Sequence, residues 1–191
     1  QAVLLDIDLG LYPFCSSTNN VAAAACISCG ISTKHIDKIV GVVKPVSTKV
    51  GLGPFPSKIE TSNPLENQFV ELGEEFGTVT SRRRQVGWLD LVLLEYAARV
   101  SGVTEIALTK VDVIEQILFN KGLPAKVCVA YSQKGPEETD ILLDRIPMIK
   151  KDIEKCHPVY ELRYNIEEII RDIEETTGVK VTYISRSKKR D

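Results

Sequence analysis

A helical segment followed at once by a buried strand is the feature that most constrains the fold of this chain. Residues 103–108 are predicted to form that strand. The same order recurs near the C-terminus, with a helix at 165–177 before a strand at 179–184. Parallel neighbouring strands need crossover connections, which are usually helices, so the chain is predicted to be an α/β protein with a mostly parallel central sheet flanked by helices. The first helix spans 88–101, and its apolar face comprises Leu89, Val92, Leu93, Tyr96, Ala97 and Val100.

The remaining segments contain shorter patterns. No internal repeat or low-complexity linker interrupts the chain, so residues 1–191 are predicted to form one α/β unit. The Gly- and Pro-rich residues 51–56 forbid a regular helix and predict a rigid loop. Strands are predicted at 3–7 and 126–131, a strand or buried connection at 36–43, a turn at Gly135-Pro136 and a short helix at 67–73.

A hydroxyl-rich turn runs directly into three arginines at Thr80-Ser81-Arg82-Arg83-Arg84. Guanidinium groups beside small hydroxyl residues offer forked donors to carboxylate or phosphate oxygens. The nearby Gly77 would let the backbone approach a ligand closely. A run of three arginines is also common as a solvent-exposed basic stretch, and the two interpretations stay open from this motif alone.

A second motif, Thr109-Lys110-Val111-Asp112, follows the strand predicted at 103–108. Ligands often bind where the strands of α/β sheets end. The Asp112 carboxylate could accept two hydrogen bonds from paired N–H donors, as guanine presents at N1 and N2. Lys and Asp are also ordinary loop residues. Taken together, the two motifs predict a nucleotide and a second anionic substrate.

An ordered set of strings along most of the chain resembles the adenylosuccinate synthetase family. These strings are LLDIDLGLYPF, STKVGLGPFP, EFGTVTSRRRQVGWLD, LTKVDV, KVCVAY and PVYEL. The resemblance implies GTP-dependent ligation of L-aspartate to IMP, giving adenylosuccinate, GDP and phosphate in AMP biosynthesis. GTP would be a co-substrate and Mg²⁺ a cofactor, and the enzyme would be a homodimer. Fixed cations would offset the repulsion among carboxylates and phosphates that must meet in such a site.

The resemblance also assigns site residues. Arg82 would additionally touch IMP, and Arg84 would lie near GTP. Gln1 would contact IMP, as would Ser16, which keeps a hydroxyl where the family usually has threonine. The aspartate site would comprise Thr78, Val79, Thr80, Ser81, Arg82, Arg83 and Arg84, and the guanine site Lys110, Val111, Asp112, Ser185, Arg186 and Ser187.

Two departures from the family pattern limit what this chain is expected to do. Nothing matches the family's glycine-rich phosphate loop with its catalytic aspartate, or its catalytic histidine, since His35 and His157 stand at other positions. The only methionine is Met148. We therefore expect the C-terminal part of a longer synthetase, or one whose earlier half was lost, cleaved or left out of the numbering. No catalytic or metal-binding residue is expected here, with the Mg²⁺ ligands mainly in the absent half.

The second departure lies near the end, where Ser185-Arg186-Ser187-Lys188 replaces the family's usual Ser-Thr-Gly-Pro and loses the residues that shape that turn. By itself, the chain is predicted to show no ligase activity. The alternative hypothesis is a stand-alone guanine-nucleotide-binding or regulatory module without catalysis. Residues 186–190 are predicted to be a frayed basic tail, with a binding patch as the alternative.

Charge and hydropathy argue against several other classes of protein. The formal net charge of −2 gives no general attraction to nucleic acid or membrane surfaces. No apolar run approaches the length of a membrane span, and the start lacks a signal-peptide pattern. The chain is therefore predicted to be cytoplasmic, with neither nucleic acid nor membrane as a partner.

The pair Cys26 and Cys29 forms a CxxC motif. A structural zinc site needs two further ligands at suitable spacing, and Cys15, Cys128 and Cys156 form no second pair. The alanine-rich flank and the odd total of cysteines favour small packing residues in a reducing compartment.

Overall fold

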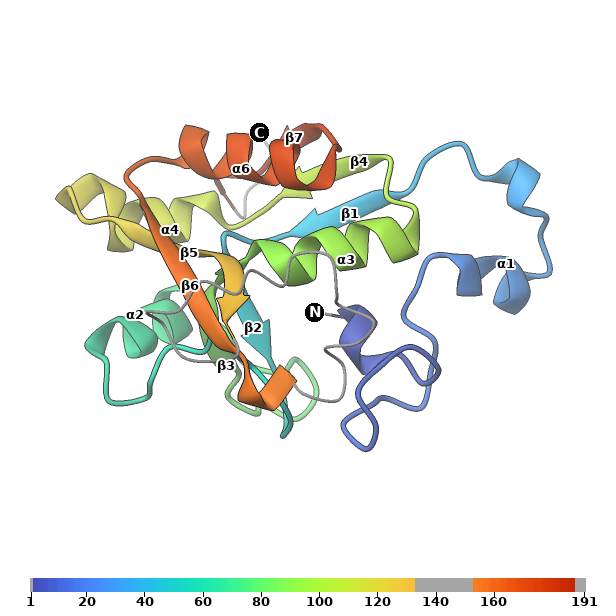
Figure 1. Ribbon diagram of the computed structural model, residues 1–191, viewed down its shortest axis with the longest axis horizontal. Coiled ribbons are helices and arrows are strands. Elements are labelled where there is room, and N and C mark those ends of the chain that lie inside the picture. The colour runs from blue at the N-terminus through green and yellow to red at the C-terminus, as the bar shows by residue number, and fades with distance from the viewer. Residues whose placement is uncertain (1, 133–152, 188–191) are drawn as a thin grey trace.

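The structure is a computed structural model that describes residues 2–132 and 153–187. Its strands form two sheets (Figure 1). The first sheet is parallel and has the order β1 (Val40–Val43), β4 (Glu105–Leu108) and β7 (Val181–Ile184). The second has the order β2 (Val46–Lys49), β3 (Gln85–Asp90), β5 (Ala125–Ser132) and β6 (His157–Arg163). In it β3 and β5 are parallel, whereas the outer strands pair antiparallel.

Helices directly follow the parallel strands β3 and β4, and the predicted α/β class with a parallel sheet flanked by helices is confirmed. Helix α3 connects β3 to β4 and packs against β5 and the C-terminal helix α6. The helices are α1 (Ala23–Cys29), α2 (Pro64–Leu72), α3 (Leu91–Ser101), α4 (Val111–Ile117) and α6 (Ile166–Thr177). Short 3₁₀ helices are η1 (Ala2–Leu5), η2 (Thr33–His35), η3 (Phe119–Lys121) and η4 (Ile153–Lys155). Figure 1 shows α1 at one end of the molecule.

Capping explains where several helices begin and end. Asn165 accepts a hydrogen bond from the Glu168 amide at 2.9 Å, and Gly178 (φ 69°) ends α6, which confirms the predicted helix. The helix predicted at 88–101 begins later, because Trp88 belongs to β3 and Asp90 caps α3 through the Leu93 amide. Helix α2, by contrast, begins earlier than predicted, at Pro64 instead of residue 67.

The strand predicted at 3–7 is wrong. These residues form η1 and a tight turn, because the chain curls back on itself. The Gly10 amide donates to the Asp6 carbonyl at 2.8 Å, and the Leu11 amide to the Leu4 carbonyl at 3.0 Å. The buried Asp6 carboxylate accepts from the amides of Asp8 and Leu9 at 3.0 Å. The turn predicted at 135–136 lies outside the described residues.

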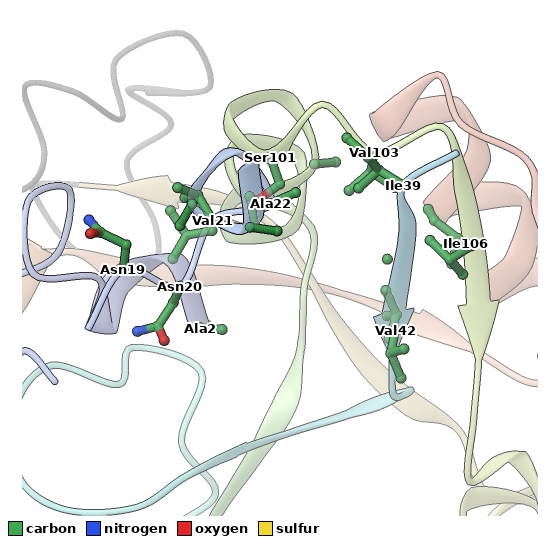
Figure 2. Close-up of a pocket in the computed structure, with 18 of the residues that line it drawn as sticks. Ala2, Asn19, Asn20, Val21, Ala22, Ile39, Val42, Ser101, Val103 and Ile106 are labelled. Carbon is green, nitrogen blue, oxygen red and sulfur yellow. The ribbon is translucent and has the colours of Figure 1, made fainter. Parts of the chain in front are cut away.

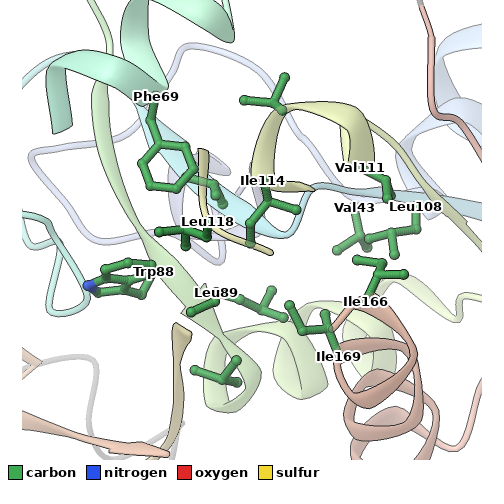
Figure 3. Packing of buried hydrophobic residues seen from close by; sticks show 14 of the residues in the cluster. Val43, Phe69, Trp88, Leu89, Leu108, Val111, Ile114, Leu118, Ile166 and Ile169 are labelled. Atoms are coloured by element: carbon green, nitrogen blue, oxygen red, sulfur yellow. The ribbon is translucent and has the colours of Figure 1, made fainter. Parts of the chain in front are cut away.

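One hydrophobic cluster draws on both sheets and on α2, α4 and α6 (Figure 3). Its side chains include Val43, Phe69, Trp88, Leu89, Leu108, Val111, Ile114, Leu118, Ile166 and Ile169. Phe69 and Trp88 meet edge to face with ring centroids 6.0 Å apart. This cluster holds the ends of β1 and β4 against α4, where the second sequence motif begins.

Removing one side chain from this cluster should be costly. Ile114 is fully buried in this cluster, so Ile114→Ala should lower the free energy of unfolding by about 2–5 kcal/mol. The control is Ile27→Ala, since Ile27 is 88% exposed and should change stability by less than about 0.5 kcal/mol. Urea denaturation of both variants measures the difference. Equal losses would mean that Ile114 does not occupy the core.

Asp90 is a buried carboxyl whose charge state should make stability depend on pH. The Tyr131 hydroxyl donates to Asp90 Oδ2 at 2.5 Å, yet burial still raises the pKa of Asp90 to about 6. In the unfolded chain this pKa is about 3.9, so the folded state binds the proton more tightly. The stability that Asp90 contributes is therefore present below about pH 4 and is lost as the pH rises through about 6.

The variant Asp90→Asn removes this titration while keeping a residue that caps helices well. The free energy of unfolding of the natural chain, relative to the variant, should fall by on the order of 3 kcal/mol between pH 4 and pH 7. Urea denaturation at several pH values measures it. A difference that stays constant across this range would show that Asp90 titrates normally.

Candidate functional site

The hydroxyl-rich turn and the arginines lie on a closed loop between α2 and β3. The Arg84 amide donates to the Glu75 carbonyl at 2.8 Å, and the Gly77 amide donates to the Arg82 carbonyl at 2.8 Å. Ser81 adopts a left-handed conformation (φ 50°) where the chain reverses. The tip of this loop, residues 78–82, is therefore exposed to solvent.

The three arginines differ in how far they are already engaged. Arg83 forms a bidentate ion pair with the buried Glu66, at 3.0 and 2.7 Å. Arg84 donates to Glu75 Oε2 at 2.9 Å. Within residues 2–132 and 153–187, Arg82 has no side-chain hydrogen bond or ion pair. Of the three, the Arg82 guanidinium is thus the one with all its donors available for a ligand.

The second motif lies where β4 ends and α4 begins. Lys110 adopts a left-handed backbone conformation (φ 57°), which costs a residue other than glycine on the order of 1 kcal/mol. Its Nζ donates to Glu75 Oε1 at 2.8 Å and to the Gly73 carbonyl at 2.5 Å. The half-buried Asp112 side chain, in the first turn of α4, accepts no hydrogen bond from the part of the chain that the structure describes. Its carboxylate oxygens are therefore available to a ligand.

Glu75 joins these two motifs, and the motif analysis did not single it out. Its carboxylate is 4% exposed and lies within 2.9 Å of Lys44 Nζ, 2.8 Å of Lys110 Nζ and 2.9 Å of Arg84 Nη1. Burial acts to raise the pKa of Glu75, but the hydrogen bonds from Lys110 and Lys44 outweigh it and hold the pKa below its ordinary value. Three cations around one carboxylate leave excess positive charge, which favours an anionic ligand.

The topology explains why Lys44 joins this group. Strands β1 and β4 are parallel neighbours, so their carboxyl ends meet at one edge of the sheet. Lys44 directly follows β1, and Lys110 follows β4 by two residues. The Thr109 amide donates to the Val43 carbonyl at 2.8 Å and holds the two strand ends together. The sequence signal that could have identified Lys44 is its position directly after the strand or buried connection predicted at 36–43.

The divergent stretch 185–187 lies beside the second motif. The Val111 amide donates to the Ser185 carbonyl at 3.2 Å, and the Ser185 amide donates to the Leu108 carbonyl at 2.8 Å. Arg186 is ion-paired to Glu115 of α4, so the predicted fraying is wrong for Arg186. Residues 188–190 of that predicted tail lie outside the described residues. The structure thus brings together the two segments assigned to guanine.

Of the two residues outside the arginine run that are assigned to IMP, Ser16 lies in the N-terminal loop. Gln1 lies outside the described residues. The Ser16 hydroxyl donates to the Leu5 carbonyl at 2.8 Å and accepts from Asn20 Nδ2 at 2.9 Å, so its described hydrogen bonds stay within the N-terminal loop. That loop touches residues 49–54 through Phe14, and Gln85 Nε2 donates to the Gly51 carbonyl at 2.7 Å. The loop at 51–56 therefore contacts both the N-terminal loop that contains Ser16 and the residue that follows the arginine run.

A separate cavity of about 560 Å³ lies between β1, α3 and the N-terminal segment (Figure 2). Its lining is mostly small and aliphatic, and none of the described residues that line it is charged. Asn19, Asn20 and Val21 approach it from one side, and Val42 of β1 from the other. None of the residues of the cation cluster at Glu75 lines this cavity.

Other candidate features give no site among residues 2–132 and 153–187. Cys26 and Cys29 of α1 are free thiols, as are Cys15, Cys128 and Cys156. Over these residues, no three His, Cys, Asp or Glu side chains are grouped so as to hold a metal ion. In the described part, every helix is too short or too polar to cross a membrane.

The fold and the site define an α/β protein with a cation-rich cluster at the carboxyl ends of parallel strands, a position typical of anion and nucleotide binding. A profile of the family described as "Adenylosuccinate synthetase" matches residues 1–191, and the chain belongs to this family. It is 41% identical over 208 aligned residues to the adenylosuccinate synthetase of Helicobacter pylori (strain ATCC 700392 / 26695). It is also 41% identical over 209 aligned residues to that of Moorella thermoacetica.

These matches include all of this chain but 47% and 46% of the two relatives, so the chain spans about half their length. Among solved structures, the fully ligated adenylosuccinate synthetase from Plasmodium falciparum is similar, with a TM-score of 0.83 and 29% identity. That match covers 97% of this chain and 46% of the other. The cyanophage S-2L succinoaminodeoxyadenylate synthetase shares the fold, with a TM-score of 0.56 and 20% identity.

Proposed function

We propose that the protein carrying this chain ligates L-aspartate to IMP at the expense of GTP, and that this chain supplies contacts to all three substrates. Adenylosuccinate, GDP and phosphate would be the products, in the synthesis of AMP. The observation that carries the proposal is the Glu75 carboxylate, which ties Arg84 of the aspartate segment to Lys110 of the guanine segment. Two segments assigned to different substrates thus meet at one point.

The guanine end of the site is built from 110–112 and 185–187. Asp112 offers two acceptor oxygens, which suit the N1 and N2 donors of guanine. Lys110, held by Glu75 and the Gly73 carbonyl, would lie against the base. The backbone pairing of Val111 with Ser185 supports a common role for the two segments, even though the family's Gly-Pro turn is lost.

The aspartate end is the exposed loop 78–84. Arg82 would bind both the aspartate and IMP, because its guanidinium is unengaged within the described residues. Arg83 and Arg84 would bind the aspartate with those guanidinium N–H groups that are not used in their ion pairs to Glu66 and Glu75. We propose that Ser16 and Gln1 complete the IMP contacts.

The chemistry of ligation explains why cations gather here. The 6-oxygen of IMP would attack the γ-phosphorus of GTP, and the aspartate amine would then displace phosphate. Carboxylates and phosphates repel one another strongly in a partly desolvated site, and fixed cations reduce that repulsion. Magnesium would supply further charge neutralisation. The described residues offer no group of three ligands for it, so we assign it no ligand in this chain.

We propose that the exposed side of β1 receives the part of the synthetase that this chain does not span. Strand β1 pairs only with β4 within the described residues, and Val42 is 72% exposed. The apolar cavity beside it is left open on a chain that spans 47% of its Helicobacter pylori relative. A packed strand and an aliphatic surface would cover both. We further propose that residues 1–191 are one unit, and that the synthetase is a cytoplasmic homodimer.

Ligand binding to the chain tests the proposed function. With IMP present, calorimetry should show binding of GDP in preference to ADP, and binding of L-aspartate. A stand-alone guanine-nucleotide module would bind GDP but have no affinity for aspartate. Absence of binding for both ligands would contradict the proposal that these contacts lie in this chain.

The isolated chain should form no adenylosuccinate from GTP, IMP and L-aspartate, because it lacks a counterpart of the catalytic aspartate and histidine. Product is measured by chromatography and mass spectrometry against a no-protein control. Turnover by the purified chain above that control would show that the residues described here suffice for catalysis.

A further inference from the structure

Glu75 is placed to control the geometry of the site as well as its charge. Its two carboxylate oxygens face different segments: Oε1 accepts from Lys110 and Lys44, and Oε2 accepts from Arg84. The Glu75 carbonyl also accepts from the Arg84 amide at 2.8 Å, so side chain and backbone hold Arg84 together. Only 4% of the Glu75 side chain is exposed, so its carboxylate contacts these partners and is largely shielded from solvent and ligand.

The neighbouring groups make the position of this carboxylate well defined. Lys44, Arg84 and Lys110 are 23%, 31% and 34% exposed, so each reaches the surface from a point fixed by Glu75. Lys44 also donates to Thr48 Oγ1 at 2.6 Å, and Lys110 to the Gly73 carbonyl. A shift of either Arg84 or Lys110 would therefore have to move the shared carboxylate.

We propose that Glu75 is a positioning residue that couples the binding of aspartate to the binding of the guanine nucleotide. The inference rests on the proposed function, since it takes Arg84 as an aspartate contact and Lys110 as a guanine contact. When one ligand fixes its cation, the shared carboxylate places the other cation in its binding position. The second ligand then binds to a site that is already ordered.

A purely electrostatic role for Glu75 predicts different results. Glu75→Gln removes a negative charge from the site, so electrostatics alone would tighten binding of GDP and aspartate. Positioning predicts weaker binding of both, because the amide is a poorer acceptor and its NH₂ group faces cations. Glu75→Asp separates the two roles again, since it keeps the charge but shortens the side chain by one methylene. A charge role would leave this variant like the natural chain.

The test is a set of binding measurements on the 191-residue chain with IMP present throughout. The dissociation constant of GDP is measured with and without saturating L-aspartate in the natural chain, Glu75→Gln and Glu75→Asp. The control is Glu105→Gln, which removes the ion pair to Lys38 at the opposite end of β4. In the natural chain and the control, aspartate should lower the constant by about 5-fold or more. In both Glu75 variants the ratio should approach one.

The outcomes separate this inference from the proposed function. A natural chain that binds neither ligand overturns both. A natural chain that binds both without coupling, or a Glu75 variant that keeps the coupling, overturns only the inference. If the Glu75 variants do not fold, the Lys110 Nζ resonance of the natural chain is followed by NMR during addition of L-aspartate. It should move although aspartate does not contact Lys110, and a fixed resonance at saturation would refute the coupling.

Discussion

Arg84→Ala should weaken the use of L-aspartate by about 100-fold, the size expected for loss of charge-assisted hydrogen bonds to a carboxylate. The measurement is made on a joined protein, in which this chain is fused to the part of the Helicobacter pylori relative that it does not match. The effect should fall on the apparent KM for aspartate and on kcat/KM. Folding should survive, because Lys44 and Lys110 still neutralise the Glu75 carboxylate.

Lys121→Ala is the control for Arg84→Ala. Lys121 is exposed, lies in η3 and belongs to neither motif, so its loss should change the aspartate kinetics by less than 2-fold, within the range of ordinary surface substitutions. Equal effects of the two substitutions would contradict the assignment of Arg84 to the aspartate site.

Asp112→Asn should reduce the preference for GTP over ATP by about 100-fold. The substitution turns one of two acceptors into a donor that faces the N–H groups of guanine, and each mismatched buried group costs about 1–3 kcal/mol. The ratio of kcat/KM for GTP and ATP in the joined protein measures it. Since xanthine carries an acceptor at position 2, the Asn variant should also accept xanthosine triphosphate better than the natural sequence does.

Asp37→Asn makes the same chemical change at an exposed position outside both motifs. It should leave the ratio of GTP to ATP use unchanged. If Asp112→Asn also leaves that ratio unchanged, then Asp112 does not read the guanine edge, and the open carboxylate at the start of α4 has another role.

The fold could be predicted from the sequence where the spacing of apolar residues and the helix-capping residues indicated the same element. Helix α6 has isoleucines on one face, Asn165 before it and Gly178 after it, and the structure follows this pattern closely. The strand predicted at 3–7 was wrong because an apolar run resembles a strand in sequence. In the structure, hydrogen bonds from the amides of Gly10 and Leu11 close a turn there. The antiparallel pairing of β2 with β3 depends on contacts between distant segments, which local periodicity does not report.

Much of the site could be predicted as a set of segments, but not as an arrangement. The sequence motifs contain Arg84 and Lys110, and both lie at the cation cluster. The motifs do not include Glu75, because a buried carboxylate that binds three cations looks, in sequence, like any surface glutamate. They do not include Lys44 either, because its place beside Lys110 depends on the pairing of β1 with β4. The partner of Arg83, Glu66, sits 17 residues earlier in α2, at a spacing that no short motif encodes.

The most direct test of the account is adenylosuccinate formation by the joined protein. As a control, the Helicobacter pylori enzyme is cut at the same point and rejoined to its own segment. We expect the joined protein to form product only when GTP, IMP and L-aspartate are all present. Val42→Asp should abolish product formation, because it places a charge on the exposed side of β1, while the chain itself stays folded. A joined protein that folds, alongside an active rejoined control, yet forms no product would contradict the claim that this chain is the substrate-binding half of a synthetase.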